Sequence, residues 1–194
     1  MFLIFDTETS GLPGDPRFPA EYVDNWPRIV QLSWGIYNSD GEELNFYNYI
    51  VKPDGFKIDK DSIKFHKITD EIANRDGHDI KDVLNFFKNS LRTDNYIVAH
   101  NMEFDMNVLG AECLRNKIKL NRKFFRRLIC TMKTTTKYCD ILHPKFNGPK
   151  WPTLQELYFK LFGEEFENSH NAIYDVKACA RCLFECIRNQ IIIL

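Results

Sequence analysis

The sequence predicts an α/β fold, and three observations support it. A short apolar run over 2–5 is typical of a strand buried in a parallel sheet. β-Branched and aromatic residues over 28–37 and 44–51 flank a polar turn, which indicates an antiparallel hairpin. A second apolar run over 95–99 leads directly into a helical pattern. Buried strands followed by amphipathic helices indicate a sheet with helices packed against it.

The first predicted strand continues without a break into two acids, Asp6 and Glu8. Side chains at positions i and i+2 project from the same face of a strand, so the two carboxylates should lie together. Burial raises the pKa of a carboxylate unless a positive group stands beside it. A divalent cation would meet that need. The Thr-Ser-Gly that follows, with Pro13 close behind, ends the strand in a loop that a substrate can approach.

Length and composition limit the function. A chain of 194 residues suits one domain over 1–194, and its 44% hydrophobic content is globular. The formal net charge of −1 means that nucleic-acid binding would need a local basic surface or metal charge. No apolar run approaches the ~20 residues that cross a bilayer, and the N-terminal segment lacks the features of a signal peptide. We therefore expect a soluble, cytoplasmic protein with no membrane partner.

The six cysteines fit free thiols better than disulfides in that compartment. Cys179, Cys182 and Cys186 recur at i, i+3 and i+7 of the last predicted helix, beside other apolar residues. Cys179-x-x-Cys182 would also serve as half of a zinc site, but no second such pair accompanies it. The interpretation we favour is a stripe of core residues.

The middle of the chain predicts helices and a long connection. The segment 12–27 is rich in proline and aromatic residues and longer than a usual turn, which suggests a flap over the site. Short helices are predicted over 61–65 and 69–73, and a firmer one over 79–91. The strand over 95–99 then ends at His100.

Asn101 is the expected N-cap of the helix that follows this strand. Asp105 lies one turn into that helix. From there a carboxylate can reach across the carboxyl ends of neighbouring strands toward Asp6 and Glu8.

The last third carries a basic stretch and two more helices. Residues 115–137 hold nine basic side chains and no acid, consistent with either a solvated face or a surface that steers phosphates. A short strand is expected over 128–130 and a loop over 140–151. Thr153 and Glu156 form a capping-box pattern for a helix that ends at Gly163. The final helix is expected over 171–189, with His170 just before it and Asp175 in its first turns.

The acids thus come from three places in the chain: Asp6 with Glu8, Asp105, and Asp175. Four carboxylates suit two divalent ions of the kind used to cleave phosphodiesters, and hard oxygen ligands favour Mg²⁺ or Mn²⁺. Histidine is the natural base for activating a water at neutral pH, which makes His170 the candidate base.

Three segments, Phe5 to Leu12, His100 to Asp105 and His170 to Asp175, resemble the three motifs of the DnaQ-like, or DEDDh, 3′-5′ exonucleases. That family includes the proofreading epsilon subunit of bacterial DNA polymerase III, oligoribonuclease and ribonuclease T. Each motif alone is weak, whereas three in the right order on the expected elements are specific. His170 matches the histidine subgroup, because the sister subgroup has a tyrosine where this chain has Asn171.

The resemblance implies an RNase H-like fold, with a mixed five-stranded sheet and helices on both faces. It also implies roles in catalysis. Asp6 would bridge two divalent cations, Glu8 and Asp175 would complete the shell of the first, and Asp105 would support the second. His170 would take the proton of the attacking water, and a nucleoside 5′-monophosphate would be released.

The resemblance further implies a set of substrate contacts. Thr9 and Ser10 match positions that hold the terminal 3′-hydroxyl, and Leu12 matches a residue that wedges beside the terminal base. Asn101 and Phe104 match residues that line the nucleotide pocket.

His66 lies in a segment, 65–69, that resembles the family's His-Gly-Ile-Thr near the terminal nucleotides. Lys67 replaces the glycine there, which leaves the backbone geometry open. His66 and His100 suit a structural hydrogen bond as well as a substrate contact, whereas His78 and His143 are expected to be surface residues.

The leading hypothesis is therefore a metal-dependent 3′-5′ exonuclease acting on single-stranded ends, with DNA favoured over RNA. Two other hypotheses stay open. One is a binding or assembly module that keeps the fold but is catalytically silent, and the other is a phosphatase that uses Asp6 as nucleophile and leaves Asp105 and His170 unused. The expected partners are single-stranded DNA or RNA 3′ ends, with a polymerase and a second copy of the chain left open.

Overall fold

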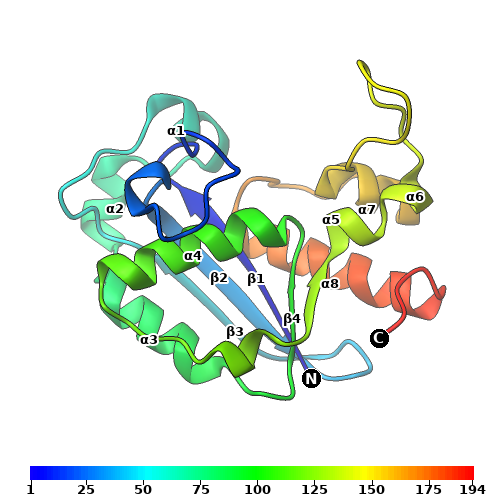
Figure 1. Ribbon diagram of the computed structural model, residues 1–194, viewed down its shortest axis with the longest axis horizontal. Coiled ribbons are helices and arrows are strands. Elements are labelled where there is room, and N and C mark those ends of the chain that lie inside the picture. Colours follow the sequence, from blue (N-terminus) through cyan, green and yellow to red (C-terminus); the bar gives the residue numbers. More distant parts are fainter.

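The computed structural model describes residues 1–194 and contains a five-stranded sheet in the order β3-β2-β1-β4-β5 (Figure 1). Strand β1 lies at the centre of the sheet, where both of its edges are paired. The strands are β1 (Phe2–Thr9), β2 (Ile29–Tyr37), β3 (Glu43–Ile50), β4 (Tyr96–Ala99) and β5 (Leu128–Cys130).

Eight α-helices connect and cover these strands, together with two short 3₁₀ helices. They are α1 (Lys60–His66), α2 (Asp70–Asp76), α3 (Ile80–Ser90), α4 (Met102–Arg115), α5 (Thr131–Thr134), α6 (Thr136–Cys139), α7 (Leu154–Phe162) and α8 (Ala172–Arg188), with η1 (Val23–Asn25) and η2 (Arg122–Phe125). None of the helices has both the length and the apolar surface that crossing a membrane requires.

The sheet is mixed, as predicted. β1 pairs antiparallel with β2, β2 pairs antiparallel with β3, and β1 and β4 run parallel, as do β4 and β5. The antiparallel pair β2–β3 is the predicted hairpin, whose tight turn places Gly41 at a φ of +88°. The parallel strands instead need long crossovers, which α1 to α3 and then α4 provide.

Alternation along β1 divides the core into two layers. Leu3 and Phe5 point toward α3 and α4, where they pack with Trp34 and Phe87 in one cluster. Phe2 and Ile4 point to the opposite face, where α7 and α8 supply the cluster. Figure 1 shows α4 crossing one face of the sheet and α8 lying on the other. Helices therefore cover both faces, which confirms the predicted architecture.

Several local predictions are confirmed. Thr153 and Glu156 form the capping box of α7, since the Thr153 hydroxyl accepts the Glu156 backbone N–H and the Glu156 carboxylate accepts the Thr153 N–H. The cysteines of α8 are buried free thiols in the core, as the stripe predicted. Asn101 does occupy the N-cap position of α4, but its side chain makes no capping hydrogen bond.

The connection over 12–27 packs against the body of the protein. Trp26 is buried and meets the ring of Phe104 edge-on at 6.1 Å. The guanidinium of Arg115 donates to the carbonyls of Val23 and Trp26. This basic residue is therefore committed to holding the connection onto α4.

Candidate active site

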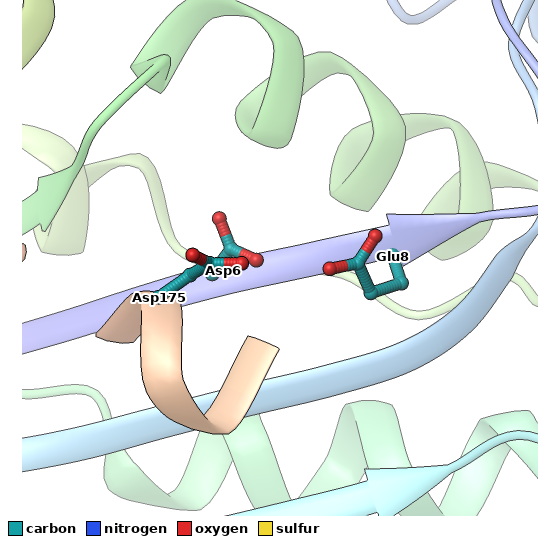
Figure 2. A group of neighbouring side chains, drawn as sticks. All are labelled: Asp6, Glu8 and Asp175. Carbon is teal, nitrogen blue, oxygen red and sulfur yellow. The ribbon is translucent and has the colours of Figure 1, made fainter. Parts of the chain in front are cut away.

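Three carboxylates from two elements form the centre of the site. Each of Asp6, Glu8 and Asp175 offers one oxygen that lies within 4.8 Å of the others. Figure 2 shows Asp6 and Glu8 projecting from β1 and Asp175 approaching from the first turn of α8. The predicted same-face alignment of Asp6 and Glu8 thus occurs, and it brings them to the face that α8 covers.

The start of α8 is positioned by the strand next to β1. Gln31 of β2 is paired with Glu8 in the sheet register, and its Oε1 accepts the backbone N–H of Ala172 at 3.3 Å. Asn171 caps the helix by accepting the N–H of Ile173 at 3.1 Å. These bonds fix the first turn of α8, and with it the position of Asp175.

Asp105 approaches from α4, on the other side of β1. Its Oδ1 accepts the Thr7 hydroxyl at 2.7 Å and the Thr7 backbone N–H at 3.1 Å. Thr7 stands between Asp6 and Glu8 and points to the opposite face, so it ties the fourth carboxylate to the same strand. Asp105 is almost fully buried, and its charge acts on both acids of β1.

Burial raises the pKa of all four acids, and repulsion by neighbouring carboxylates adds to the shift at Asp6, Glu8 and Asp175. Burial, followed by the charges of Asp105, Asp175 and Glu8, raises the pKa of Asp6 well above its ordinary value. The same two causes raise the pKa of Glu8 to about 8. Burial raises the pKa values of Asp105 and Asp175 to about 7, although hydrogen bonds to each oppose the shift. Hard oxygen donors crowded in this way fit a divalent cation, which would remove their repulsion.

The stability of the metal-free protein should therefore fall as pH rises. Between an unfolded pKa near 4 and folded values near 7 to 8, the folded state binds more protons than the unfolded state, so raising the pH favours unfolding. We expect Tm in EDTA to drop by about 10 °C between pH 5 and pH 8.5. Calorimetry or scanning fluorimetry across that range measures the effect.

Mg²⁺ or Mn²⁺ should restore Tm at the alkaline end of this range, where the acids are ionised, and should act little at pH 5. Monovalent salt at equal ionic strength is the control, since screening alone would act with either salt. A Tm that ignores divalent ions at pH 8.5 would contradict a cation site among these acids.

The Thr7 hydroxyl should matter for activity through its bond to Asp105. In Thr7→Val the shape is kept and the 2.7 Å hydrogen bond is lost, so the pKa of Asp105 rises further and its orientation loosens. We expect kcat/KM on an oligonucleotide to fall about tenfold near pH 7, with more divalent ion needed for half-maximal rate. Thr7→Ser keeps the hydroxyl and should retain most of the activity. Equal losses in both variants would contradict this role.

His170 lies at the edge of the same site in a special backbone conformation. Its φ of +65° falls in the left-handed region, which non-glycine residues seldom adopt. The ring meets that of Phe65 from α1 edge-on, with centroids 5.2 Å apart. The conformation places a histidine beside Asp175, five residues further along the chain.

A cavity of about 590 Å³ joins these groups. It is lined by eight of the residues singled out from the sequence as candidates for the site, which are Asp6, Glu8, His100, Asn101, Phe104, Asp105, His170 and Asp175. The rest of the wall comes from segments that sequence reasoning missed, chiefly the approach to α7 from Trp151 to Gln155. No local pattern marks that stretch as part of a site, because only the crossover of the chain brings it there.

Four expected substrate contacts lie outside this cavity. The hydroxyl of Thr9 donates to the Gly11 carbonyl at 2.7 Å, and that of Ser10 accepts the Arg28 N–H at 3.0 Å, so both shape the loop after β1. Leu12 follows with 85% of its surface exposed. His66 is buried, and its Nδ1 accepts the N–H of Ile68.

The neighbouring histidine, His100, has a structural role. Its Nδ1 lies 3.0 Å from the Thr131 hydroxyl and its Nε2 lies 3.0 Å from the Pro152 carbonyl. Burial lowers the pKa of His100 to about 4, so the ring is neutral. It holds the chain before α7 against the end of β4.

Lys67, which stands where the resembling motif has glycine, adopts a φ of +63°. It therefore keeps the left-handed geometry that a glycine would supply, at some cost in strain.

A family model described as Exonuclease matches residues 3–183. The DNA polymerase III PolC-type of Pediococcus pentosaceus is 28% identical over 174 residues, covering 90% of this chain and 10% of that protein. The Bacillus subtilis protein of the same name is 26% identical over 194 residues, covering 97% and 11%. The chain spans about a tenth of the length of these curated relatives.

Two solved structures share the fold. E. coli exonuclease I in complex with a dT13 oligonucleotide superposes with a TM-score of 0.79 at 19% identity, covering 97% of this chain and 41% of that one. Exonuclease X in complex with 5′ overhanging duplex DNA superposes with a TM-score of 0.63 at 26% identity, covering 97% and 92%. The RNase H-like fold expected from the sequence is confirmed.

Proposed function

Because this chain belongs to the exonuclease family, we propose that residues 1–194 form one domain that is a metal-dependent 3′-5′ exonuclease. It removes nucleoside 5′-monophosphates from the 3′ ends of single-stranded nucleic acid and favours DNA over RNA. The observation that carries this proposal is the convergence of Asp6, Glu8 and Asp175 within 4.8 Å in a cavity that also holds Asp105 and His170.

Each acid has a proposed part in holding two divalent cations, Mg²⁺ or Mn²⁺. Asp6, at the centre of the cluster, would contact both cations, Glu8 and Asp175 would complete the ligands of the first, and Asp105 would support the second. When bound, the cations would supply positive charge that lowers the pKa of water and stabilises the charge that builds on the phosphate. The carboxylates alone would repel a phosphodiester, so a site of this composition suits binding only when cations are present.

His170 is the proposed general base. It stands at the rim of the cavity, beside Asp175, and an imidazole there can take a proton from the attacking water. Asn101 and Phe104 line the same cavity, where they suit contacts to the terminal nucleotide. Thr9, Ser10, Leu12 and His66 belong to the loop after β1 and the end of α1, and we propose that they hold the 3′ end from that side.

The preference for DNA rests on the relatives. Exonuclease I and exonuclease X are described in complex with DNA, and the PolC-type proteins are DNA polymerases. Their resemblance to this chain supports a DNA substrate and an association with a polymerase. The contacts that would exclude a 2′-hydroxyl are few and local, so RNA is the competing substrate to measure.

The proposal is tested with 5′-labelled DNA and RNA oligonucleotides of one sequence, incubated with Mg²⁺ or Mn²⁺. A ladder of shortened 5′-labelled products, faster on DNA than on RNA, is the expected result. If the 5′ label were released at once as a mononucleotide, degradation would start at the 5′ end, which would contradict the proposed 3′-5′ direction. Binding without turnover in every divalent ion would favour the catalytically silent module instead.

A further inference from the structure

A short arm of the chain, residues 141–150, projects beside the proposed active site. Its two sides are joined by the isolated bridge between Leu142 and Pro149 and by hydrogen bonds from His143 N–H to the Gly148 carbonyl and from Lys150 N–H to the Ile141 carbonyl. In Figure 1 it is the yellow segment that extends away from α6 and α7. The loop expected over 140–151 is therefore confirmed, and a single bridge closes it into a hairpin-like arm.

The tip of the arm is ordered by its own side chains. The Nδ1 of His143 accepts the backbone N–H groups of Lys145 and Phe146 at 3.1 and 3.2 Å. The rings of His143 and Phe146 then face each other at 4.6 Å, and Gly148 makes the turn at a φ of +117° that other residues avoid. The ring of Phe146 is thus held in place although 72% of its surface is exposed.

The arm carries exposed apolar side chains and positive charge together. Leu142 is 78% exposed and Trp151, which follows the arm, is 59% exposed. No acid occurs between Ile141 and Gln155, whereas Lys145 and Lys150 lie in that stretch. The next acid, Glu156, accepts the Lys150 ammonium through both oxygens at 2.6 and 2.7 Å, so these two charges cancel and Lys145 supplies the positive charge of the arm.

Trp151 connects this surface to the cavity. Its side chain lines the cavity that holds the acids, and the ammonium of Lys133, which also pairs with Glu103 at 2.6 Å, lies 5.3 Å from the centre of its ring. A strand whose 3′ end occupies the cavity would therefore pass Trp151 before reaching the arm. Aromatic faces that bases can stack on, interleaved with cations, are the pattern of single-strand binding surfaces.

We propose that the arm, residues 141–150, and Trp151 form a second binding site for single-stranded nucleic acid, which stacks on bases several nucleotides upstream of the 3′ end. This rests on the proposed function for the direction of the strand. The site gives longer strands an affinity that a dinucleotide lacks. The exposed rings beside Lys145, the absence of an unpaired acid on the arm and the continuity with the cavity favour a nucleic acid over a protein partner as the occupant.

Tryptophan fluorescence tests the site directly. Of the three tryptophans, Trp26 and Trp34 are buried, so Trp151 alone is placed to be quenched by a stacked base. The His170→Asn protein, in which the acids are untouched and turnover should be about 1,000-fold slower, is titrated in Mg²⁺ with dT12 and with dT2. We expect dT12 to quench the emission and dT2 to do so far more weakly. In Trp151→Phe the change in emission should disappear while binding, followed by anisotropy of labelled dT12, persists.

Two alanine variants locate the contact. Phe146→Ala should weaken dT12 binding about tenfold, which is the typical effect of losing one stacked base. Phe86→Ala, which removes an exposed ring from α3, is the matched control and should bind like the parent. Turnover of a small diester, the p-nitrophenyl ester of thymidine 5′-monophosphate, should be the same in Phe146→Ala as in the parent.

The outcomes separate this inference from the proposed function. Exonuclease activity with unquenched Trp151 and parent-like binding by Phe146→Ala would overturn the second site and leave the function standing. Quenching by dT12 without any exonuclease activity would support the second site and overturn the proposed function. If the parent protein instead self-associates through the arm and Phe146→Ala abolishes that self-association, a second copy of the chain is the occupant and the second nucleic-acid site is overturned.

Discussion

Asp6→Asn should reduce exonuclease activity by at least about 1,000-fold while leaving the fold intact. Asp6 is the acid whose pKa burial and all three neighbouring carboxylates raise, so it is the centre of the negative charge. Replacing it with the isosteric amide removes the ligand that would contact both cations. Loss of several kcal/mol of charge stabilisation in the transition state corresponds to at least about three powers of ten in rate.

The same variant should be more stable than the parent in EDTA. One of four repelling groups is gone, so Tm near pH 8 is expected to rise, and the restoring effect of Mg²⁺ should weaken. Activity loss combined with raised stability distinguishes a functional acid from a structural one. Asp94→Asn, which alters an exposed acid before β4, is the control and should change neither quantity. Parent-like activity in Asp6→Asn would remove the basis for the assigned site.

His170→Asn should lower kcat by about 1,000-fold, within the range that a general base contributes. Asparagine tolerates the left-handed backbone that His170 adopts at a φ of +65°, so the substitution removes the imidazole without disturbing the chain. Alanine at this position would add backbone strain to the chemical loss, which makes it the poorer test.

The matched control is His78→Asn, which removes an exposed imidazole far from the cavity. KM for the oligonucleotide and the Mg²⁺ response of Tm should both stay at parent values in His170→Asn, because the acids are untouched. If KM rises by the same factor by which kcat falls, His170 binds substrate rather than moving a proton.

The parts of the fold and site that are local in sequence could be predicted. The alternation that puts Asp6 and Glu8 on one face, the capping box of α7 and the cysteine stripe of α8 are each encoded within a few consecutive residues. The order of the three motifs then identified the family, and with it the sheet.

The parts that depend on distant contacts could not be predicted. Nothing near Thr7 shows that its hydroxyl holds Asp105, which lies 98 positions away, and nothing near Gln31 shows that it receives the start of α8. Helices α5 and α6 were missed because each is only four residues long and residues of low helix propensity, Thr131 and Thr134 in α5 and Thr136, Tyr138 and Cys139 in α6, make up half or more of each. Their positions follow from packing beneath α8 and α7 rather than from local preference.

The direction in which the β1 side chains point depends on how many residues precede Asp6 in the strand. A single residue deleted before Asp6 would turn both β1 acids to the α4 face and send Thr7 toward α8, so every ligand would be misplaced at once. Insertions in the connections between the motifs leave the acids and Thr7 on their present faces of the sheet. A change of length in those connections should therefore cost the site far less than one residue removed from this strand.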